Sequence, residues 1–493
     1  MIVTWLLLGL VTFATALPAQ AAPPAPMSTS MVAAGDSFET WATGQTLRLD
    51  LFHSGTFHRG TAGEEHFAID RVRREGAWPG SVVRLLDDTN LGKYFLRVVD
   101  PNTQRTLYSR GFASIFGEWE TTGEARGGTW GTIHESVRFP EPRNPVQVVI
   151  AKRSGNGTFQ QIFSTLVDPA HRSVDRSPLP EVGELWTLRD SGPAATKVDL
   201  LILGDGYTLQ KRDKFLADAR RAEAALFASE PFKSRAGDFN VRALHPPSQD
   251  SGVTDPRAKA WHNTPLGLSY NAFDSERYVL TFANRELREI AAQAPYDALI
   301  LLGNSRKYGG GGIFNLWTTA AAGSAEADYL VVHEFGHSFA GLGDEYYTSQ
   351  VSYEDFNPPG VEPWEPNITA LLPGRPLKWN HLKAEATPVP TPWEQEDYDE
   401  ISLAYQRERQ ALREAGASEE RMEELFDKVR ETTRPLLDSE RYAGEVGAFE
   451  GAGYQAKGLY RPQADCIMFT RNPKDFCAVC SEAVSRVIDL YAH

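Results

Sequence analysis

Two histidines and a glutamate within residues 333–337 are the side chains in this sequence most suited to chemistry. The segment reads His333-Glu334-Phe335-Gly336-His337. On a helix, residues four apart lie on the same face one turn apart, so both imidazoles can reach one metal ion, and zinc is the metal that this pattern predicts. The carboxylate of Glu334 can accept a proton from a metal-activated water and pass it to a leaving amine. Peptide hydrolysis needs this chemistry, although the same short pattern also occurs in helices that bind no metal.

A third ligand is required, because a catalytic zinc takes three protein ligands and keeps one position open. The candidates are Asp344 and its neighbour Glu345. On a continuous helix Asp344 would lie roughly 10 Å beyond His337 at about 1.5 Å per residue, which is too far for ligand bonds of about 2 Å. We therefore expect the helix to end at Gly341, in the left-handed conformation that glycine readily adopts, and the chain to turn back. Spacing alone does not choose between Asp344 and Glu345.

Three residues near the carboxyl end are candidates to support this site. Met468 lies in a short apolar turn, and a methionine below a metal can form an apolar floor for the ligand imidazoles. Tyr454 and Tyr460 lie in a glycine- and tyrosine-rich stretch, and either hydroxyl could donate a hydrogen bond to an oxyanion. The alternatives are the ordinary roles of these residue types, which are gap filling for methionine and a structural hydrogen bond for tyrosine.

All three cysteines of the chain, Cys466, Cys477 and Cys480, lie near its carboxyl end. Three cysteines in a chain of this length do not make a disulfide scaffold. In an oxidising compartment they predict one disulfide bridge and one free thiol, with the pairing left open. A structural zinc ion would require four ligands. Because Cys477-x-x-Cys480 has no second pair of cysteines, we favour the disulfide over structural zinc.

The first residues, 1–21, form an apolar run that is typical of a secretory signal peptide. Ala19-Gln20-Ala21 offers a small-x-small cleavage site. No Lys or Arg precedes the run, which makes this a weak example of such a signal or places the true start upstream. An uncleaved amino-terminal anchor is the alternative. No later segment is apolar for long enough to cross a bilayer. We therefore expect a secreted, periplasmic or cell-surface protein that has no membrane contact after signal cleavage.

Length and charge restrict the architecture and the partners. The chain has 493 residues, of which 41% are apolar, and this is enough for two domains with hydrophobic cores. The net charge of −15 disfavours nucleic acid or an anionic membrane as a partner, because either would be repelled. The sequence predicts no particular oligomeric state.

Residues 36–168 alternate between β-rich runs and turn signals, which predicts an all-β sandwich of immunoglobulin-like size. No constellation of reactive groups lies in this region. Residues 169–193 are rich in proline, serine and charge, and we interpret them as a linker. The predicted strands of the sandwich are 46–52, 66–72, 94–99, 106–112, 136–139, 146–151 and 160–166.

Residues 194–493 are predicted to form an α/β domain that carries the metal site. Apolar runs alternate with helical patterns, which favours a largely parallel sheet. Within this domain, residues 396–437 are mainly charged helix formers, which predicts a helical hairpin insertion without chemistry of its own. The other predicted elements are strands at 198–203, 239–245 and 298–302 and helices at 211–227 and 275–292.

The segment 308–317 contains four consecutive glycines. It is not a phosphate-binding loop, because no Lys-Ser/Thr follows the glycines. We expect a backbone that passes close to a neighbouring element and then becomes an edge strand, where an extended peptide could bind through main-chain hydrogen bonds. A flexible loop that leads into an ordinary edge strand is the alternative.

The segment from His333 to Tyr346 resembles the IgA-peptidase family of bacterial zinc metallopeptidases. It departs from the usual metzincin pattern, H-E-x-x-H-x-x-G-x-x-H/D, by one extra residue before Gly341. The similarity includes the β-rich amino-terminal region and therefore covers nearly the whole chain after the signal segment. The other similar segments are 203–207, 263–267, 308–315, 451–462 and 476–480.

The resemblance implies a metzincin-like zincin as the catalytic domain. In such a domain His333, His337 and Asp344 would hold one zinc ion. Glu334 would be the general base, and Met468 would form the turn below the metal.

The site chemistry and the resemblance together predict a secreted zinc endopeptidase that acts on a protein or peptide substrate. Cleavage of immunoglobulin does not follow, because nothing in the sequence selects one exposed peptide over another. One alternative is a binding or adhesion protein whose zinc site is vestigial. Another is a zinc-dependent amidase for a non-protein substrate, which would have a closed pocket in place of a peptide-length groove.

Overall fold

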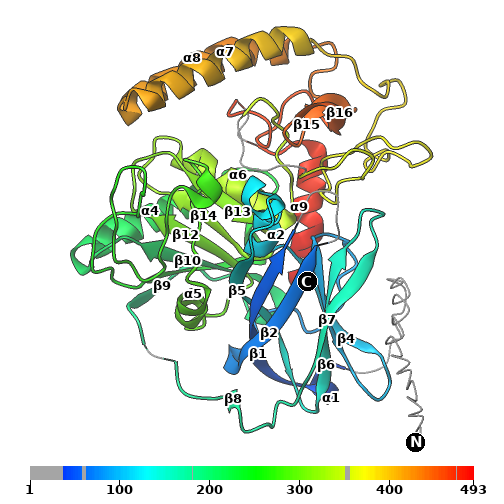
Figure 1. Cartoon of the computed structure of the whole chain (residues 1–493), viewed down its shortest axis with the longest axis vertical. Helices are drawn as coiled ribbons and strands as arrows, with labels where there is room; N and C mark the ends of the chain where they lie inside the picture. The colour runs from blue at the N-terminus through cyan, green and yellow to red at the C-terminus, as the bar shows by residue number, and fades with distance from the viewer. Residues whose placement is uncertain (1–36, 58–62, 180, 350–355, 473–474) are drawn as a thin grey trace, which may run out of the picture.

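A β-rich amino-terminal domain packs beside a larger domain built on a six-stranded sheet, and two long helices lie across the larger domain (Figure 1). Among the residues described, no helix combines the length and the apolar character needed to cross a bilayer. The predicted signal peptide, 1–21, lies outside the described residues. The structure is a computed structural model and describes residues 37–57, 63–179, 181–349, 356–472 and 475–493.

Two four-stranded sheets form the amino-terminal domain, in the orders β5-β1-β2-β8 and β4-β3-β6-β7. Alternate residues of a strand point to the same face, and this places Leu47 and Leu49 of one sheet in a buried cluster with Leu96 and Val98 of the other. Every predicted strand of this region lies within an observed one. The strands are β1 Ala42–Thr56, β2 Glu64–Ala77, β3 Tyr94–Val99, β4 Thr106–Phe112, β5 Gly131–Pro142, β6 Val146–Arg153, β7 Phe159–Val167 and β8 Val174–Asp175, and the short helices are α1 Phe38–Trp41, α2 Ile115–Trp119 and α3 Gly123–Arg126.

Residues 169–193, predicted as a linker, contain two strands, β8 and β9, and each strand joins a sheet of a different domain. Strand β8 runs parallel to β2 in the amino-terminal domain. Strand β9 (Glu184–Arg189) pairs antiparallel with β11 (Phe239–His245) in the larger domain. Trp186 and Leu188 of β9 pack against the core of the larger domain. Their burial outweighs the proline- and serine-rich composition around them.

The sheet of the larger domain has the order β13-β14-β12-β10-β11-β9. Its central strands are parallel, as predicted, since β10 pairs parallel with β11 and β12, and β12 pairs parallel with β14. The edge strands β9 and β13 are antiparallel to their neighbours. The remaining strands are β10 Val198–Asp205, β12 Ala298–Gly303, β13 Gly310–Ile313 and β14 Trp317–Ala321, with a separate two-stranded sheet of β15 Phe449–Ala452 and β16 Gln455–Arg461.

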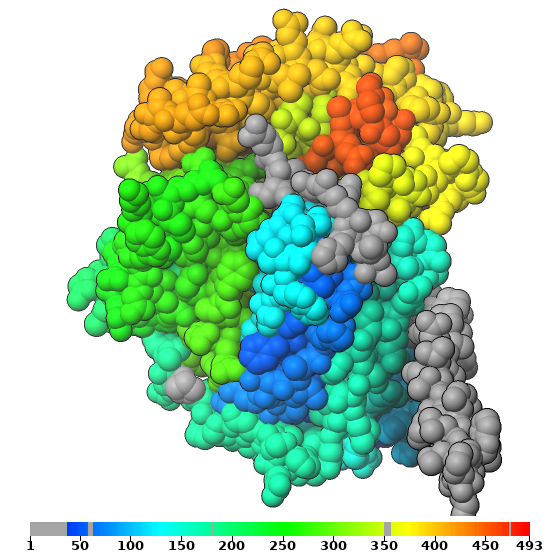
Figure 2. Space-filling model, viewed as in Figure 1, coloured from blue at the N-terminus to red at the C-terminus, as the bar shows by residue number. Residues whose placement is uncertain are grey.

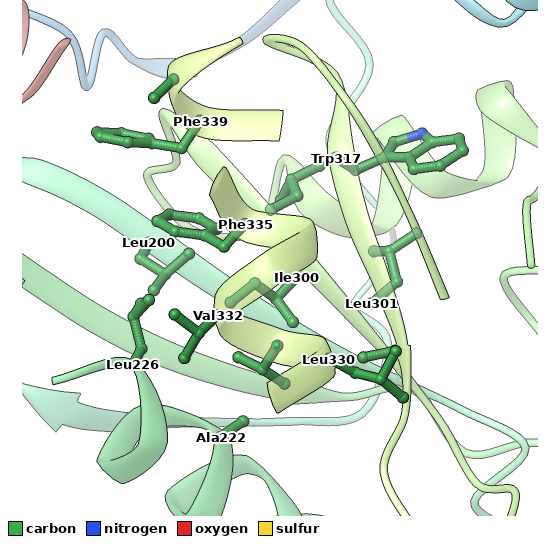
Figure 3. Close-up of a cluster of buried hydrophobic side chains, with 14 of the residues drawn as sticks. Leu200, Ala222, Leu226, Ile300, Leu301, Trp317, Leu330, Val332, Phe335 and Phe339 are labelled. Atoms are coloured by element: carbon green, nitrogen blue, oxygen red, sulfur yellow. The ribbon is translucent and has the colours of Figure 1, made fainter. Parts of the chain in front are cut away.

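Helix α6 carries the histidine motif and packs on this sheet. Val332 and Phe335 of α6 lie in one buried cluster with Leu200 of β10 and Leu226 of α4 (Figure 3). Burying a side chain of this size contributes roughly 1.5–3 kcal/mol, so the cluster fixes the position of the helix over the sheet. The helices of this part of the domain are α4 Arg212–Leu226, α5 Asn284–Ala291, α6 Ala327–Ala340 and α9 Ala478–Tyr491.

Helix α5 is shorter than the helix predicted at 275–292. The residues before it are held in extended pairings, since Tyr278 bridges Gly310 and Leu280 bridges Ser269. These tertiary contacts override the helical pattern of the local sequence.

Two long helices, α7 (Gln395–Glu414) and α8 (Glu419–Asp438), lie side by side across one end of the molecule (Figure 2). They are joined to the body of the domain by Phe426 of α8, whose ring contacts Tyr308. The guanidinium of Arg471 lies 4.1 Å from the centre of the same ring. The pair therefore packs on the larger domain and does not extend into solvent alone.

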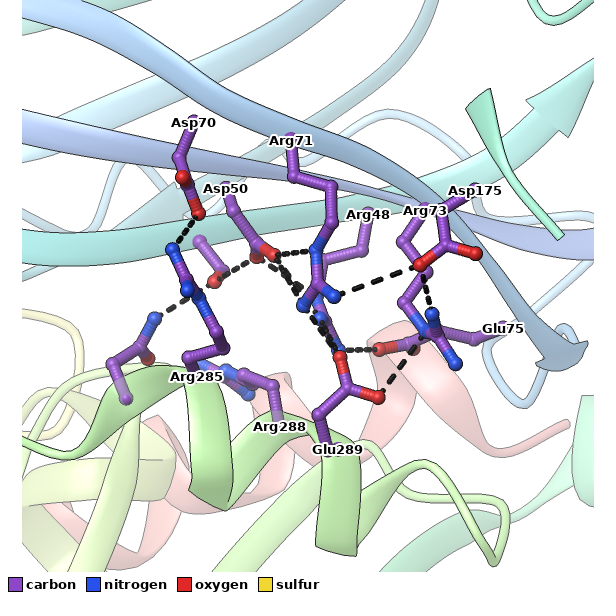
Figure 4. Close-up of polar contacts among 12 residues, drawn as sticks. Arg48, Asp50, Asp70, Arg71, Arg73, Glu75, Asp175, Arg285, Arg288 and Glu289 are labelled. Atoms are coloured by element: carbon purple, nitrogen blue, oxygen red, sulfur yellow. Dashed lines mark hydrogen bonds and ion pairs between the residues drawn. The ribbon is translucent and has the colours of Figure 1, made fainter. Parts of the chain in front are cut away.

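Buried ion pairs join the two domains (Figure 4). The guanidinium of Arg48 on β1 is fully buried and lies 2.7 Å from each of three carboxylates, those of Asp50, Glu75 and Glu289. Glu289 belongs to α5 of the larger domain, so this network crosses the interface. A buried charge is costly without its partners, and the network therefore favours one relative orientation of the domains.

Candidate metal centre

His333 and His337 stand one turn apart on α6 and direct their Nε2 atoms to one point, where these atoms are 3.2 Å apart. The Oδ1 atom of Asp344 lies 3.2 Å from Nε2 of His333 and 3.1 Å from Nε2 of His337. In a tetrahedral zinc site with bonds of about 2.0–2.1 Å, ligand atoms are about 3.3 Å apart. The three atoms therefore form a triangle whose size suits one zinc ion.

The helix ends at the predicted glycine. Gly341 has φ 64° and ψ 26°, in the left-handed region, and its N–H donates to the carbonyl of His337. A Cβ atom at this position would lie 2.8 Å from the ring of Trp364. The position needs glycine both for its conformation and for its small size. The turn brings Asp344 back towards the two histidines.

The structure separates the two candidates for the third ligand. The carboxylate of Asp344 faces the two imidazoles. The side chain of Glu345 is fully buried and points away from them, towards Cys480. The Oε1 atom of Glu345 lies 3.3 Å from Sγ of Cys480 and accepts a hydrogen bond of 2.8 Å from the side chain of Asn367. The geometry therefore favours Asp344.

Backbone carbonyls hold both imidazoles by their other nitrogen. Nδ1 of His333 lies 3.0 Å from the carbonyl oxygen of Ile467, and Nδ1 of His337 lies 2.5 Å from that of Leu342. A carbonyl can only accept, so each Nδ1 carries the hydrogen. The neutral form of each ring then has its lone pair on Nε2, which is the arrangement of a metal-ligating histidine.

Met468 lies fully buried below α6. A Cβ atom at Gly336, between the two histidines, would lie 3.2 Å from its sulfur. The carbonyl of Met468 accepts a hydrogen bond of 2.9 Å from the backbone N–H of Glu345. Because the neighbouring Ile467 holds His333, this turn supports both the first histidine and the loop that carries Asp344.

Of the two candidate tyrosines, Tyr454 lies at the site. Its hydroxyl donates a hydrogen bond of 2.5 Å to Oδ2 of Asp344. The hydroxyl of Tyr460 instead lies 3.4 Å from the carboxylate of Glu450 in the small sheet. Tyr454 thus orients Asp344 and is not placed as a free donor for an oxyanion.

Burial and neighbouring charges shift the pKa values of the site. Burial raises the pKa of the Glu334 carboxyl above its ordinary value, which suits a proton acceptor that must later donate. Burial disfavours the charged forms of His337 and Asp344, but the attraction between the two opposite charges is larger than this effect. The attraction raises the pKa of His337 to about 9 and holds the pKa of Asp344 well below its usual range. A cation that enters this site must displace the proton of His337.

The glycine-rich segment forms the edge strand β13, and the neighbouring element that its backbone approaches is the part of α6 around Glu334. A Cβ atom at Gly312 would lie 2.2 Å from the carbonyl oxygen of Glu334, and one at Gly310 would lie 3.2 Å from its Cγ. Strand β13 is at the edge of the sheet, but Gly310 already bridges Tyr278. Of the four residues of β13, only Gly312 is partly exposed, and it also lines the cavity.

The three candidate metal ligands, His333, His337 and Asp344, line a cavity of about 200 Å³ together with Glu334. The amino-terminal domain contributes Ala113 and Glu118 to its wall, and the helices α7 and α8 contribute Arg409 and Phe426 among others. Residues 396–437, predicted to be a helical hairpin without chemistry of its own, therefore contribute to the wall of this cavity. No motif in the sequence marks their position over the site.

Two residues that line the cavity, Arg277 and Tyr346, were not predicted as site residues from the sequence. Arg277 donates a hydrogen bond of 2.9 Å to the hydroxyl of Tyr346, and both side chains line the cavity. The ring of Tyr346 lies 6.4 Å from that of His333, measured between ring centres. Arg277 comes from the irregular segment before α5, so periodicity does not reveal it, whereas Tyr346 could be found from its closeness to Asp344 in sequence.

The predicted disulfide is not formed. Cys466, Cys477 and Cys480 all lie within the described residues, are buried and have free thiols. The sulfur atoms of Cys466 and Cys480 are 3.9 Å apart, against about 2.05 Å for a disulfide bond. The three thiols gather around the carboxylate of Glu345 instead.

Comparisons with known proteins agree with this architecture. Residues 186–488 match the family model described as IgA Peptidase M64, and residues 37–164 match that of the Peptidase M64 N-terminus. A comparison with curated proteins found no match. The first match spans more than half of the chain and contains α6 and all the residues that converge on the cavity floor. The chain therefore belongs to the IgA peptidase M64 family, a family of peptidases.

Proposed function

We propose that this protein is a secreted zinc endopeptidase in which Glu334 is the general base. The observation that supports this most is the convergence of His333, His337 and Asp344 beside Glu334 at the floor of a cavity. Two neutral imidazoles and a carboxylate are a donor set that zinc uses in catalytic sites. When bound, zinc would polarise a peptide carbonyl and lower the pKa of a water molecule towards about 7.

Glu334 would take the proton of the attacking water on a carboxylate oxygen and deliver it to the leaving amine nitrogen. Its raised pKa favours this second transfer, because a protonated carboxyl is then more accessible at neutral pH. Tyr454 and the carbonyl of Ile467 would keep Asp344 and His333 in place during the reaction. The left-handed glycine after the helix and the methionine below it support a metzincin-like fold for this domain.

The substrate in this proposal is an exposed peptide segment. Gly312, the partly exposed residue of β13, would contact the extended peptide, and the cavity would receive side chains next to the cleaved bond. Secretion rests on the apolar run at 1–21 with its small-x-small site. The acidic net charge of −15 is consistent with a protein that does not bind nucleic acid.

The test is cleavage of a mixed peptide library by the purified protein and by Glu334→Ala, read by mass spectrometry. Zinc content is measured on both proteins. We expect the wild type alone to cut internal peptide bonds while both proteins hold the same amount of zinc. Bound zinc without cleavage of any peptide would contradict the peptide substrate and favour the amidase. No zinc in either protein would contradict the enzyme itself.

A further inference from the structure

We propose a second metal site, for a structural zinc ion, formed by Cys466, Cys477, Cys480 and Glu345. One donor atom from each residue lies within 4.8 Å of all the others. Each of these residues is at most 6% exposed. The cluster uses every cysteine of the chain. The cluster is separate from the group of His333, Glu334 and His337. A structural zinc ion takes four ligands, and Glu345 supplies the fourth beside the three cysteines.

The measured distances suit an ion between the donors. The sulfur atoms of Cys466 and Cys480 are 3.9 Å apart, and Sγ of Cys480 lies 3.3 Å from Oε1 of Glu345. In a tetrahedron with Zn–S bonds of about 2.3 Å and a Zn–O bond of about 2.0–2.2 Å, these edges are about 3.8 and about 3.6 Å. A disulfide would bring the sulfur atoms to about 2.05 Å.

Glu345 retains acceptor capacity that no protein group uses. Its Oε2 atom is buried and has no hydrogen-bond partner among the described residues. Burying a carboxylate oxygen without a partner is costly. The side chain is nevertheless held in place, because Asn367 donates to its Oε1 and also bonds the backbone of Gly343 in both directions. A cation at the thiol cluster would satisfy this carboxylate.

Backbone N–H groups and a helix end face the sulfur atoms of the cluster, where they could stabilise a metal-bound thiolate. The N–H of Cys477 lies 3.3 Å from Sγ of Cys466, and the N–H of Cys480 lies 3.5 Å from Sγ of Cys477. Cys477 is the N-cap of α9, so the positive end of the helix dipole faces the cluster. The buried guanidinium of Arg461 interacts electrostatically with Glu345 and adds positive charge.

The position of the cluster gives the ion a structural role. Glu345 directly follows Asp344, and its N–H bonds the carbonyl of Met468. Cys466 lies just before the carbonyl of Ile467 that holds His333. A metal ion here would tie α9 to the turn below the first histidine and to the loop that carries Asp344.

Zinc content per chain tests the site, measured by mass spectrometry after dialysis against metal-free buffer. We expect about two zinc ions in the wild type and about one in the double variant His333→Ala/His337→Ala. Glu345→Gln and Cys477→Ser/Cys480→Ser should each lose about one ion. A zinc-free double histidine variant that is folded by circular dichroism would overturn the proposal.

A cobalt measurement keeps the test valid where the cysteine variants fail to fold. The full-length His333→Ala/His337→Ala protein is reconstituted with Co²⁺, and its absorption spectrum is recorded. Thiolate ligation predicts an intense sulfur-to-cobalt charge-transfer band in the near ultraviolet, which histidine and carboxylate ligands do not give. Absence of this band, or an intact mass that shows the loss of a hydrogen pair to a disulfide, would overturn the proposal.

Discussion

Asp344 is engaged through both of its carboxylate oxygens. Oδ1 faces the two imidazoles, and Oδ2 accepts the hydrogen bond of Tyr454. Because the loss of such a supporting hydrogen bond typically costs 10–100-fold in metal affinity, we expect Tyr454→Phe to weaken zinc binding by about 10–100-fold. Competition with a chromophoric chelator measures this. Tyr460→Phe, whose hydroxyl bonds Glu450, is the matched control, and equal affinities of the two variants would contradict the role of Tyr454.

His337 gives zinc binding a defined dependence on pH. Burial opposes its charge, but Asp344 raises its pKa to about 9, so the ring carries a proton at neutral pH and must release it to a metal. Affinity for zinc should therefore rise about tenfold per pH unit and level off above about pH 9. Zinc titrations of the chelator-treated protein across this range provide the measurement. An affinity that falls as pH rises would contradict the protonation of His337.

At the scale of elements, α7 places Arg409 in the wall of the cavity. If this helix contacts substrate, Arg409→Gln should lower kcat/KM by roughly 10–100-fold through KM, because a hydrogen bond to a charged group contributes about 1.5–3 kcal/mol. Zinc content should not change. Arg407→Gln, at an exposed position of the same helix, is the control. Peptidase kinetics at several substrate concentrations separate KM from kcat, and an unchanged KM would show that α7 is not part of the substrate wall.

The strands could be predicted from sequence where one face is regularly buried. β3, β4 and β11 have the predicted bounds because their alternating or continuous apolar residues enter a core. The predicted helix at 275–292 fails in its first half, where Tyr278 and Leu280 pair with residues distant in sequence. Strand β9 was not predicted, because its extended conformation depends on its pairing with β11, which is distant in sequence.

The candidate metal ligands His333, His337 and Asp344 were predictable because they lie close together in sequence. A helical spacing of four brings the histidines together, and Gly341 marks the reversal that returns Asp344. The thiol cluster was not predictable in this way, because 135 positions separate Glu345 from Cys480. No local pattern joins a carboxylate to cysteines at that distance, and only the fold brings them into contact.

At the scale of the molecule, the amino-terminal domain is joined to the larger domain at the cavity itself. The N–H of Ala113 donates a hydrogen bond of 2.9 Å to the carbonyl of Phe314, just beyond β13. The side chain of Asn315 donates to the carbonyl of Gly111. Both contacts lie beside the edge strand, so the β-rich domain supports the wall of the cleft.

The ion-pair network between the domains should contribute strongly to stability. Arg48→Met would remove the one guanidinium that contacts all three carboxylates, those of Asp50, Glu75 and Glu289. Arg71 would still pair with Asp50 and Glu289, and Arg138 with Glu75. Removing one partner from a buried pair typically costs about 3–5 kcal/mol, and we expect a loss of this size in the free energy of unfolding in urea. Arg421→Met, which breaks an exposed pair with Glu424, should stay close to wild type. Equal unfolding midpoints for the two variants would contradict this role of Arg48.

The peptidase rate of chelator-treated protein, followed during stepwise addition of zinc, tests the central claim most directly. Wild type and Glu334→Gln are compared with their bound zinc measured in parallel. We predict that the wild type regains activity as zinc is added, and that full activity requires an ion in addition to the one at the thiol cluster. Glu334→Gln should bind the same zinc and remain slower by about 10²–10⁴-fold. Activity that is indifferent to zinc, or equal in the two proteins, would contradict the assignment of a zinc peptidase with Glu334 as its base.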